Sequence, residues 1–190
     1  MPTPFARALA DLAEDQFRRF ELFDENDDVL GPQIRRYWEE IGLDFPGVGT
    51  AWSAVFVSWC MRTAGAAARE FEVSSAHARF VHWAIGNARR ETGLFRARPI
   101  AERGPLVGDV IHWNRDGGTV DFAFAAGHKR YNSHSAIVLE TGEDSLGRFA
   151  LTVGGNESDS VRRQRIALDA NGLVKQRQRN PFISVIEKLK

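Results

Sequence analysis

The sequence has a single cysteine, Cys60, among its 190 residues. An internal disulfide bond therefore cannot form, and metal clusters held by several cysteines are excluded. The chain also has no run approaching the ~20 apolar residues that a membrane-spanning helix needs. Its formal net charge is zero, with 25 basic and 25 acidic residues, so no overall charge attracts it to nucleic acid or to anionic membranes.

The N-terminal segment lacks the continuous apolar region of a secretory signal peptide, because Asp11, Glu14 and Asp15 interrupt its apolar residues. We therefore expect synthesis in the cytoplasm without a signal peptide. Any action in the periplasm or at the cell wall then requires a separate delivery route.

The length and composition are those of an ordinary soluble protein. A chain of 190 residues with 43% hydrophobic residues suits one domain, residues 1–190, with a substantial core. A locally basic C-terminal part has two interpretations, an exposed pair of strands or a surface that binds a polyanion. Its basic residues are Arg162, Arg163, Arg165, Lys175, Arg177 and Arg179.

The first half has the apolar spacing of helices. We predict a helix over about residues 4–22, a second with Pro32 in its first turn that ends at Gly42, and a buried third from an N-cap at Thr50 to Gly65. A fourth begins near Ser74 or Ser75.

The second half has short segments rich in β-branched and aromatic residues, separated by turn-forming residues. The predicted strands are GDVIHW, SHSAIVLE, RFALTVGG, SVRRQRIAL and PFISVIEK. Residues 115–132 are predicted to be a long loop. Helices over about 1–90 followed by strands over about 105–190 predict an α+β fold, with helices packed on a small antiparallel sheet.

Three separated residues are candidates for chemistry. Ser53 stands at the start of the buried helix, where the helix dipole and unpaired N–H groups stabilise an anion. His134 opens a strand, where its ring can deprotonate a hydroxyl near neutral pH. Asn156 follows two glycines, where its amide can orient a histidine. Each residue also has a structural interpretation: a helix-capping serine, a hydrogen-bonded structural histidine and a turn-forming asparagine.

Four motifs in order carry a resemblance to known families. They are WSAVFVSWCMRTAG, GPLVGDVIHW, SHSAIVLE and TVGGNESDSV, and together they span about residues 52–161. They resemble the motifs of the NlpC/P60 and CHAP hydrolases, which have a papain-like α+β fold, and they are most similar to the DUF2272 group of bacterial domains. In this chain a serine, Ser53, stands where that superfamily normally has its nucleophilic cysteine.

The resemblance implies roles for particular residues. Ser53 takes the nucleophile position, His134 that of the general base and Asn156 that of the orienting group. Substrate-binding roles are expected for three further residues, which are Trp52, His77 and Trp113. Asp109 matches an aspartate that is usually structural in these families.

The implied function is a peptidoglycan amidase or peptidase that cleaves an amide bond in the cell wall, as an antibacterial effector or a phage-type lysin. The expected partners are peptidoglycan or a cell-wall peptide and a secretion-system or immunity protein, with no nucleic acid and no membrane span. We expect no cofactor and no metal, with a zinc site at His77, His128 and His134 as the alternative. Cys60 is expected to be a core residue.

A serine at the nucleophile position is compatible with three kinds of protein, because a hydroxyl is much harder to deprotonate than a thiol. The chain is either a serine hydrolase with a rebuilt oxyanion hole, a binding module that has kept the cleft, or a protein whose serine was introduced to trap substrate. The DUF2272-like motif, which has a serine itself, argues against the last. A role in assembling a phage-like or secretion particle, with the first helix as the docking element, is a further alternative.

Overall fold

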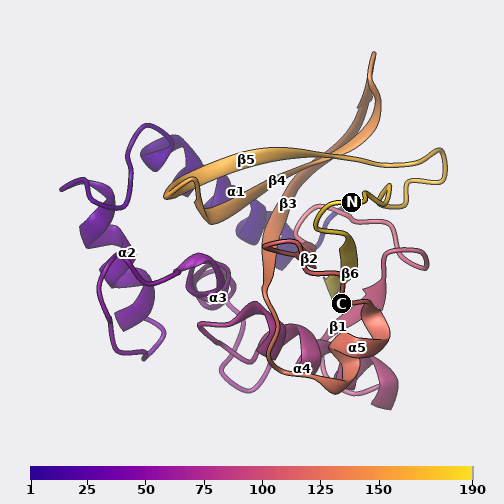
Figure 1. The fold of residues 1–190 in the computed structure, drawn as a ribbon, viewed down its shortest axis with the longest axis horizontal. Coiled ribbons are helices and arrows are strands. Elements are labelled where there is room, and N and C mark those ends of the chain that lie inside the picture. The colour runs from indigo at the N-terminus through magenta and orange to yellow at the C-terminus, as the bar shows by residue number, and fades with distance from the viewer. Residues whose placement is uncertain (190) are drawn as a thin grey trace.

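A computed structural model describes residues 1–189 as five helices and six strands (Figure 1). The helices are α1 (Pro4–Phe20), α2 (Leu30–Glu39), α3 (Ser53–Thr63), α4 (His77–Arg90) and α5 (Phe122–Gly127). The strands are β1 (Phe95–Pro99), β2 (Val110–Asn114), β3 (Ser133–Asp144), β4 (Gly147–Glu157), β5 (Ser160–Ala167) and β6 (Phe182–Lys188).

The strands form one six-stranded sheet in the order β1-β6-β2-β3-β4-β5, in which every neighbouring pair is antiparallel. The C-terminal strand β6 is therefore inserted between β1 and β2. The far end of the β3–β4 hairpin projects from the body of the molecule (Figure 1). Helices in the first half and an antiparallel sheet in the second confirm the predicted α+β class.

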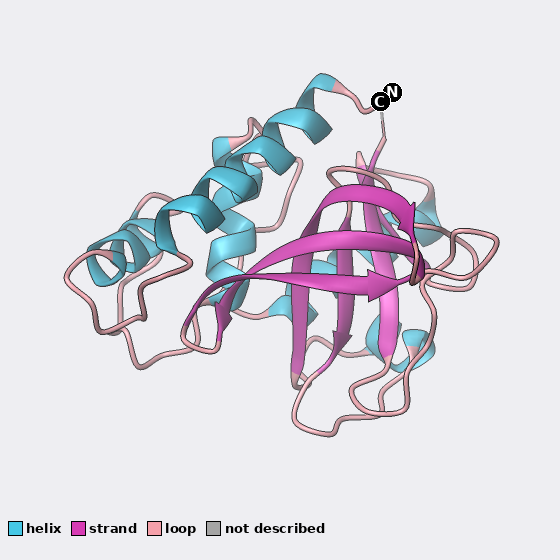
Figure 2. Ribbon diagram, turned by 90° about the horizontal axis from the view of Figure 1, so that it is seen from above, coloured by secondary structure: helices cyan, strands magenta, loops and turns pink. Residues whose placement is uncertain are grey.

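The buried helix α3 packs against β3 and β4, and α1 lies against β3, β4 and β5 (Figure 2). Every side chain of α3 from Ser53 to Met61 is buried, as its nearly uniform apolar sequence predicts. The apolar side of α1 is also buried, through Leu9, Ala13 and Phe20. Because α1 uses this face inside the molecule, the face is not free to dock a partner.

Two predicted helix starts were wrong by a few residues, and the shifts bear on the site. The third helix begins at Ser53, with Trp52 as its N-cap in place of Thr50, and the fourth begins at His77. Ser74 does not start that helix; its hydroxyl instead accepts a hydrogen bond from the Ala76 N–H at 3.0 Å.

Two short elements were not predicted from the sequence. Helix α5 lies inside the predicted loop 115–132, and the Asp121 side chain that caps it accepts from the Phe124 N–H at 2.8 Å. Asp121 is the feature of the sequence from which the start of this helix could have been predicted, because aspartate is a favoured N-cap residue. Strand β1 has only five residues, two of them the arginines Arg96 and Arg98, so its apolar pattern is weak.

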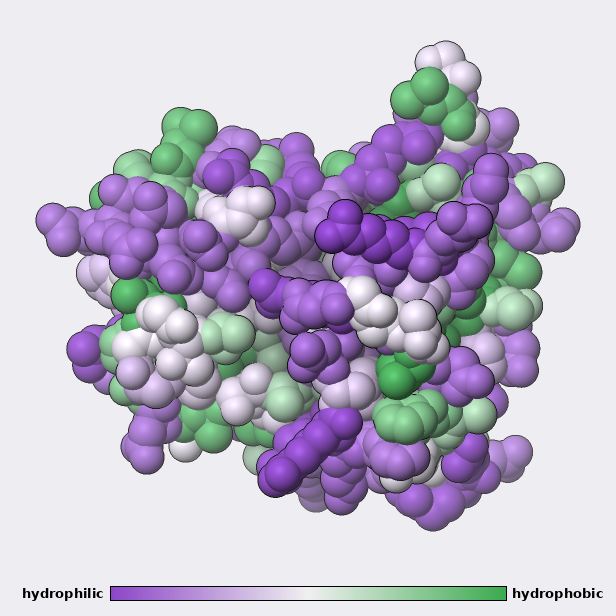
Figure 3. Space-filling model, viewed as in Figure 1, coloured by the Kyte–Doolittle hydropathy of each residue, from purple (hydrophilic) through white to green (hydrophobic). Residues whose placement is uncertain are grey.

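The arginines of β5 make contacts within the molecule. Arg162 donates to the Glu21 carbonyl at 2.7 Å, Arg163 pairs with Glu14 of α1, and Arg165 pairs with Asp144 at 2.8 Å. These contacts tie the exposed side of β5 to α1 and to the β3–β4 hairpin, which favours the interpretation as an exposed strand pair. The face in Figure 3 is largely hydrophilic, with apolar residues in small groups. Among the described helices none is long and apolar enough to span a bilayer.

Candidate active site

Ser53 is the first residue of α3, and only 3% of its surface is exposed. The N-cap residue Trp52 makes no side-chain cap hydrogen bond, so no capping side chain occupies the first N–H groups of the helix. Ser53 does not act as a cap itself, because its Oγ lies 2.8 Å from the Nε2 atom of His77. The hydroxyl therefore stands at the positive end of a helix, beside a histidine nitrogen.

Hydrogen bonds between Ser58 and Ser74 hold His77 opposite Ser53. The Ser58 hydroxyl, one turn further along α3, donates to the Ser74 carbonyl and accepts from the Ser74 N–H, both at 3.0 Å. These two bonds fasten the segment before α4 to the side of α3. As a result the first residue of α4 meets the first residue of α3, and the two helices begin at the same point.

Burial governs the protonation of His77, which is 5% exposed. Desolvation is the main cause that lowers the pKa of its imidazole well below the ordinary value, and the nearby charges of His134, His112 and Arg115 lower it further. His77 is therefore neutral at pH 7. With Nε2 accepting the Ser53 proton, the ring hydrogen resides on Nδ1, a buried atom with no hydrogen-bond partner among the described residues.

His134 lies beside this pair, and its ring centroid is 5.1 Å from that of His77. Its Nε2 is directed toward Gly154: a Cβ placed on Gly154 would meet His134 Nε2 at 3.0 Å, whereas one on the adjacent Gly155 would meet Phe56 of α3 at 2.6 Å.

The partner of His134 is Glu157, which was not among the residues predicted from the sequence. Glu157 Oε1 lies 2.8 Å from His134 Nε2, and its other oxygen accepts from Gln164 Nε2 at 2.7 Å. The pair is enclosed by Trp113, whose ring centroid is 4.9 Å from that of His134. Gly154 leaves the necessary space, because a Cβ there would clash with Glu157 Oε1. The sequence does contain a feature that could have indicated this partner, which is the acidic residue directly after the GGN segment.

Asn156 does not meet His134. Its backbone has a φ of 55°, at the point where the β4–β5 register shifts, and its amide donates to Glu25 Oε2 at 2.9 Å. The same oxygen accepts from Trp52 Nε1 at 3.0 Å. The structure therefore differs from the predicted Ser53–His134–Asn156 arrangement, because Ser53 pairs with His77 and the residue after Asn156 holds His134.

The surroundings of the other residues singled out in the sequence indicate structural roles. Trp52 is completely buried, and Trp113 is 5% exposed, so neither presents a free ring to a substrate. Asp109 accepts from the Leu106 N–H at 2.8 Å and from Arg103 at 3.2 Å, which fastens the turn before β2. Burial nevertheless raises the pKa of the Asp109 carboxyl to about 7.

A third histidine, His112, is completely buried beside the site. Its Nδ1 lies 2.8 Å from Ser135 Oγ and its Nε2 lies 3.1 Å from the Tyr131 hydroxyl. Burial lowers its pKa to about 3 from the ordinary 6.5, so the folded protein holds it neutral.

We predict an acid-dependent loss of stability from His112. Between pH 6.5 and 3 the unfolded chain binds a proton at His112 that the folded chain does not, so stability is full above pH 6.5 and falls as the pH drops. The loss from this residue is about 2 kcal/mol between pH 6.5 and 5. Urea denaturation at both pH values, with His112→Gln beside the native chain, checks it. An equal pH dependence of the two proteins would contradict this origin.

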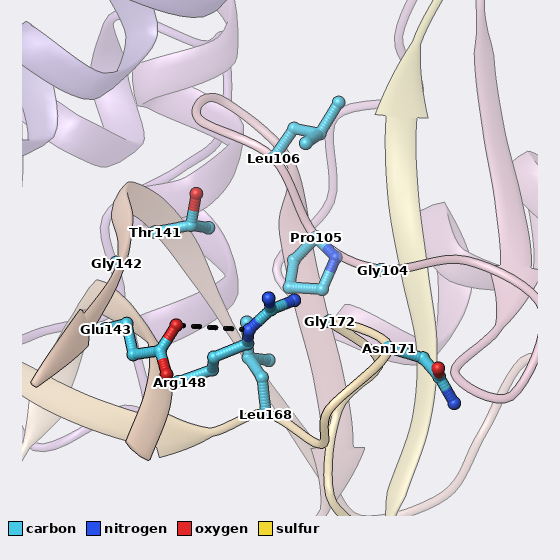
Figure 4. Close-up of a pocket in the computed structure, with 10 residues that line it drawn as sticks. All are labelled: Gly104, Pro105, Leu106, Thr141, Gly142, Glu143, Arg148, Leu168, Asn171 and Gly172. Carbon is cyan, nitrogen blue, oxygen red and sulfur yellow. Dashed lines mark ion pairs between the residues drawn. The ribbon is translucent and has the colours of Figure 1, made fainter. Parts of the chain in front are cut away.

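The Ser53–His77 pair opens onto a cavity of about 350 Å³. The cavity is lined by Ala51, Ser53, Ser75, Ala76, His77, Arg115, Asp116, Tyr131, Asn132 and Ser133. A larger cavity of about 460 Å³ lies elsewhere, around Arg148 (Figure 4). Its charged residues Arg148 and Glu143 pair with each other at 3.4 Å, and its walls carry no histidine, so it offers no comparable chemistry.

Metal ligands do not gather at the site. Within residues 1–189 no group of three or more His, Cys, Asp or Glu side chains is placed to hold a metal ion. His128, a member of the alternative zinc set, is exposed and stacks on Phe124 at 3.8 Å between ring centroids. Cys60 is fully buried, and burial raises the pKa of its thiol well above the ordinary value, which suits a core residue.

Comparison with known proteins gives one match. A family described as "Uncharacterized protein conserved in bacteria (DUF2272)" matches residues 36–185, which is well over half of the chain. The matched region extends beyond the four motifs at both ends. No curated protein and no solved structure matches the chain. Because the family description names no activity, the cavity is the main indication of function.

Proposed function

The chain belongs to the DUF2272 family of proteins conserved in bacteria, and from the geometry of its cavity we propose that it is an amide hydrolase with Ser53 as nucleophile and His77 as general base. The observation that carries the proposal is the 2.8 Å contact between Ser53 Oγ and His77 Nε2 on the wall of an open cavity. A base must lie within hydrogen-bond reach of the proton it removes, and this one does.

The proposed reaction uses the neutral state of His77. The Ser53 proton passes to His77 Nε2 as Oγ forms a bond to the substrate carbonyl carbon. The resulting oxyanion lies at the start of α3, where uncapped N–H groups stabilise negative charge. The C–N bond then breaks as His77 Nε2 returns the proton to the leaving amine. Water releases the acyl group from Ser53 by the same two proton transfers.

His134 and Glu157 have a positioning role in this proposal. Glu157 holds one ring nitrogen of His134, and the charge of His134 lowers the pKa of His77. Together with desolvation by burial, which is the larger cause, this charge keeps His77 unprotonated at neutral pH and so able to accept a proton.

The proposed fold family is the papain-like NlpC/P60–CHAP group, and the proposed substrate is a peptide amide of peptidoglycan. Support comes from a nucleophile at the start of a buried helix that packs on an antiparallel sheet, together with a histidine near the start of the adjoining strand. From this proposed activity on the cell wall follows the further proposal that the chain is an antibacterial effector or a phage-type lysin. Its partners would then be a delivery apparatus or an immunity protein.

The test is digestion of purified peptidoglycan followed by mass spectrometry of the soluble fragments. We expect fragments whose new amine and carboxyl ends identify the cleaved amide, with none from Ser53→Ala. Ser75→Ala is the matched control, because Ser75 lines the same cavity without contacting His77 in the hydrogen bonds of residues 1–189. Binding of peptidoglycan with no fragments from the native chain would contradict the hydrolase and favour the binding module.

A further inference from the structure

Two helices begin at the wall of the same cavity. Ser53 is the first residue of α3 and His77 the first of α4, and both line the cavity. Neither N-cap residue, Trp52 or Ala76, makes a side-chain cap hydrogen bond. The positive ends of two helix dipoles thus converge on one space, which favours a negatively charged ligand.

Arg115 adds a full positive charge to the same wall. It follows the last residue of β2, and its backbone N–H donates to the Asn132 carbonyl at 3.1 Å, which fixes the base of its side chain. Its charge is near enough to lower the pKa of His77. A guanidinium is suited to a carboxylate, because the two planar groups can make paired hydrogen bonds.

The ion pair that Arg115 makes within the chain is weak. Its Nε lies 3.8 Å from Asp116 Oδ1, and the two side chains are 42% and 64% exposed. Exposed pairs of this kind contribute about 0–1 kcal/mol, so a substrate carboxylate can replace Asp116 at little cost.

The reacting pair lies on the same wall as Arg115. Both Ser53 and His77 line the cavity, with Ser53 Oγ 2.8 Å from His77 Nε2, so a carboxylate bound by Arg115 would be held beside the nucleophile.

We propose that the cavity recognises a carboxylate of the substrate, bound by Arg115 next to the scissile amide. This inference rests on the proposed function and deepens it. The substrate class is an anionic peptide with a free carboxylate within about one residue of the cleaved bond, as at the C-terminal end of a peptidoglycan stem peptide.

Binding to the Ser53→Ala protein tests the inference without turnover. The ligands are the stem peptide L-Ala-γ-D-Glu-L-Lys-D-Ala and the same peptide with its carboxylates converted to carboxamides, compared by calorimetry. We expect the anionic form to bind at least about tenfold more tightly, as a charge-assisted hydrogen bond predicts. Adding Arg115→Gln removes this preference, whereas Arg115→Lys retains part of it. Arg130→Gln, an exposed arginine outside the lining of the cavity, is the matched control and keeps it.

Equal binding of the two peptides, no binding of either, or a preference that survives Arg115→Gln would overturn the carboxylate site. The experiments distinguish failure of the carboxylate site from failure of the proposed hydrolase activity. Fragment release that depends on Ser53 but shows no carboxylate preference would overturn this inference alone. A preference that depends on Arg115, in a protein that releases no fragments, would overturn the hydrolase alone.

Discussion

Replacing Ser53 by alanine is expected to lower the rate of peptidoglycan cleavage by about 10⁶-fold, the order of magnitude seen when a serine nucleophile is removed. The alanine has no oxygen to attack the carbonyl, and the remaining cavity can only bind and orient the peptide. The side chain is 3% exposed and the change is small, so the fold should persist. The measurement is the initial rate at which new amino groups are released from peptidoglycan.

The controls for this prediction separate chemistry from folding. Ser75→Ala should retain the native rate, and the circular dichroism of Ser53→Ala should match that of the native chain. Ser53→Cys reports whether the site also works with the thiol that the resembling families use. A rate for Ser53→Ala within tenfold of the native one would remove Ser53 from the reaction.

Replacing His77 by glutamine is expected to lower kcat by about 10²–10⁴-fold, the usual contribution of a positioned general base. Glutamine nearly preserves the volume of the ring but cannot take the Ser53 proton. The pH profile gives a second readout. The reaction needs neutral His77, and burial lowers its pKa, so native activity should persist as the pH falls below 6.5 and be lost only at lower pH. The His77→Gln variant should lack that acid limb.

His128→Gln is the matched control, because His128 is exposed and stacks on Phe124. His134→Gln provides the decisive comparison, since the resemblance implies that His134 is the base. In the proposed mechanism it acts through the pKa of His77, so its loss should shift the acid limb more than it lowers the maximal rate. A larger fall in kcat from His134→Gln than from His77→Gln would return the role of base to His134.

The sequence was sufficient for the α+β fold class and for the place of Ser53 near the start of a buried helix. The apolar pattern of α3 and the glycine-rich loop before it predicted a buried helix with Ser53 near its start, and the structure has Ser53 as its first residue. These features depend on local periodicity and on turn chemistry, which a single sequence contains. The α+β order followed from the same patterns.

The partner of Ser53 was not predictable in this way. Whether a strand residue faces a helix depends on register, and a shift of one residue moves a side chain to the opposite face. The expected contact of Asn156 with His134 is absent for this reason, because Asn156 has a left-handed backbone at a register shift and the next residue, Glu157, contacts His134. His77 was recognised only as a candidate for the cleft wall, because the contact of Ser58 with Ser74 that positions it joins segments far apart in the chain.

The most direct test of the Ser53–His77 pair is labelling with a fluorophosphonate, which reacts with serines activated by a base, followed by peptide mapping with mass spectrometry. We predict one adduct on Ser53 in the native chain and its loss in His77→Gln, with the adduct retained in His128→Gln. Absence of an adduct on native Ser53, or labelling of Ser53 that is undiminished in His77→Gln, would contradict the catalytic pair.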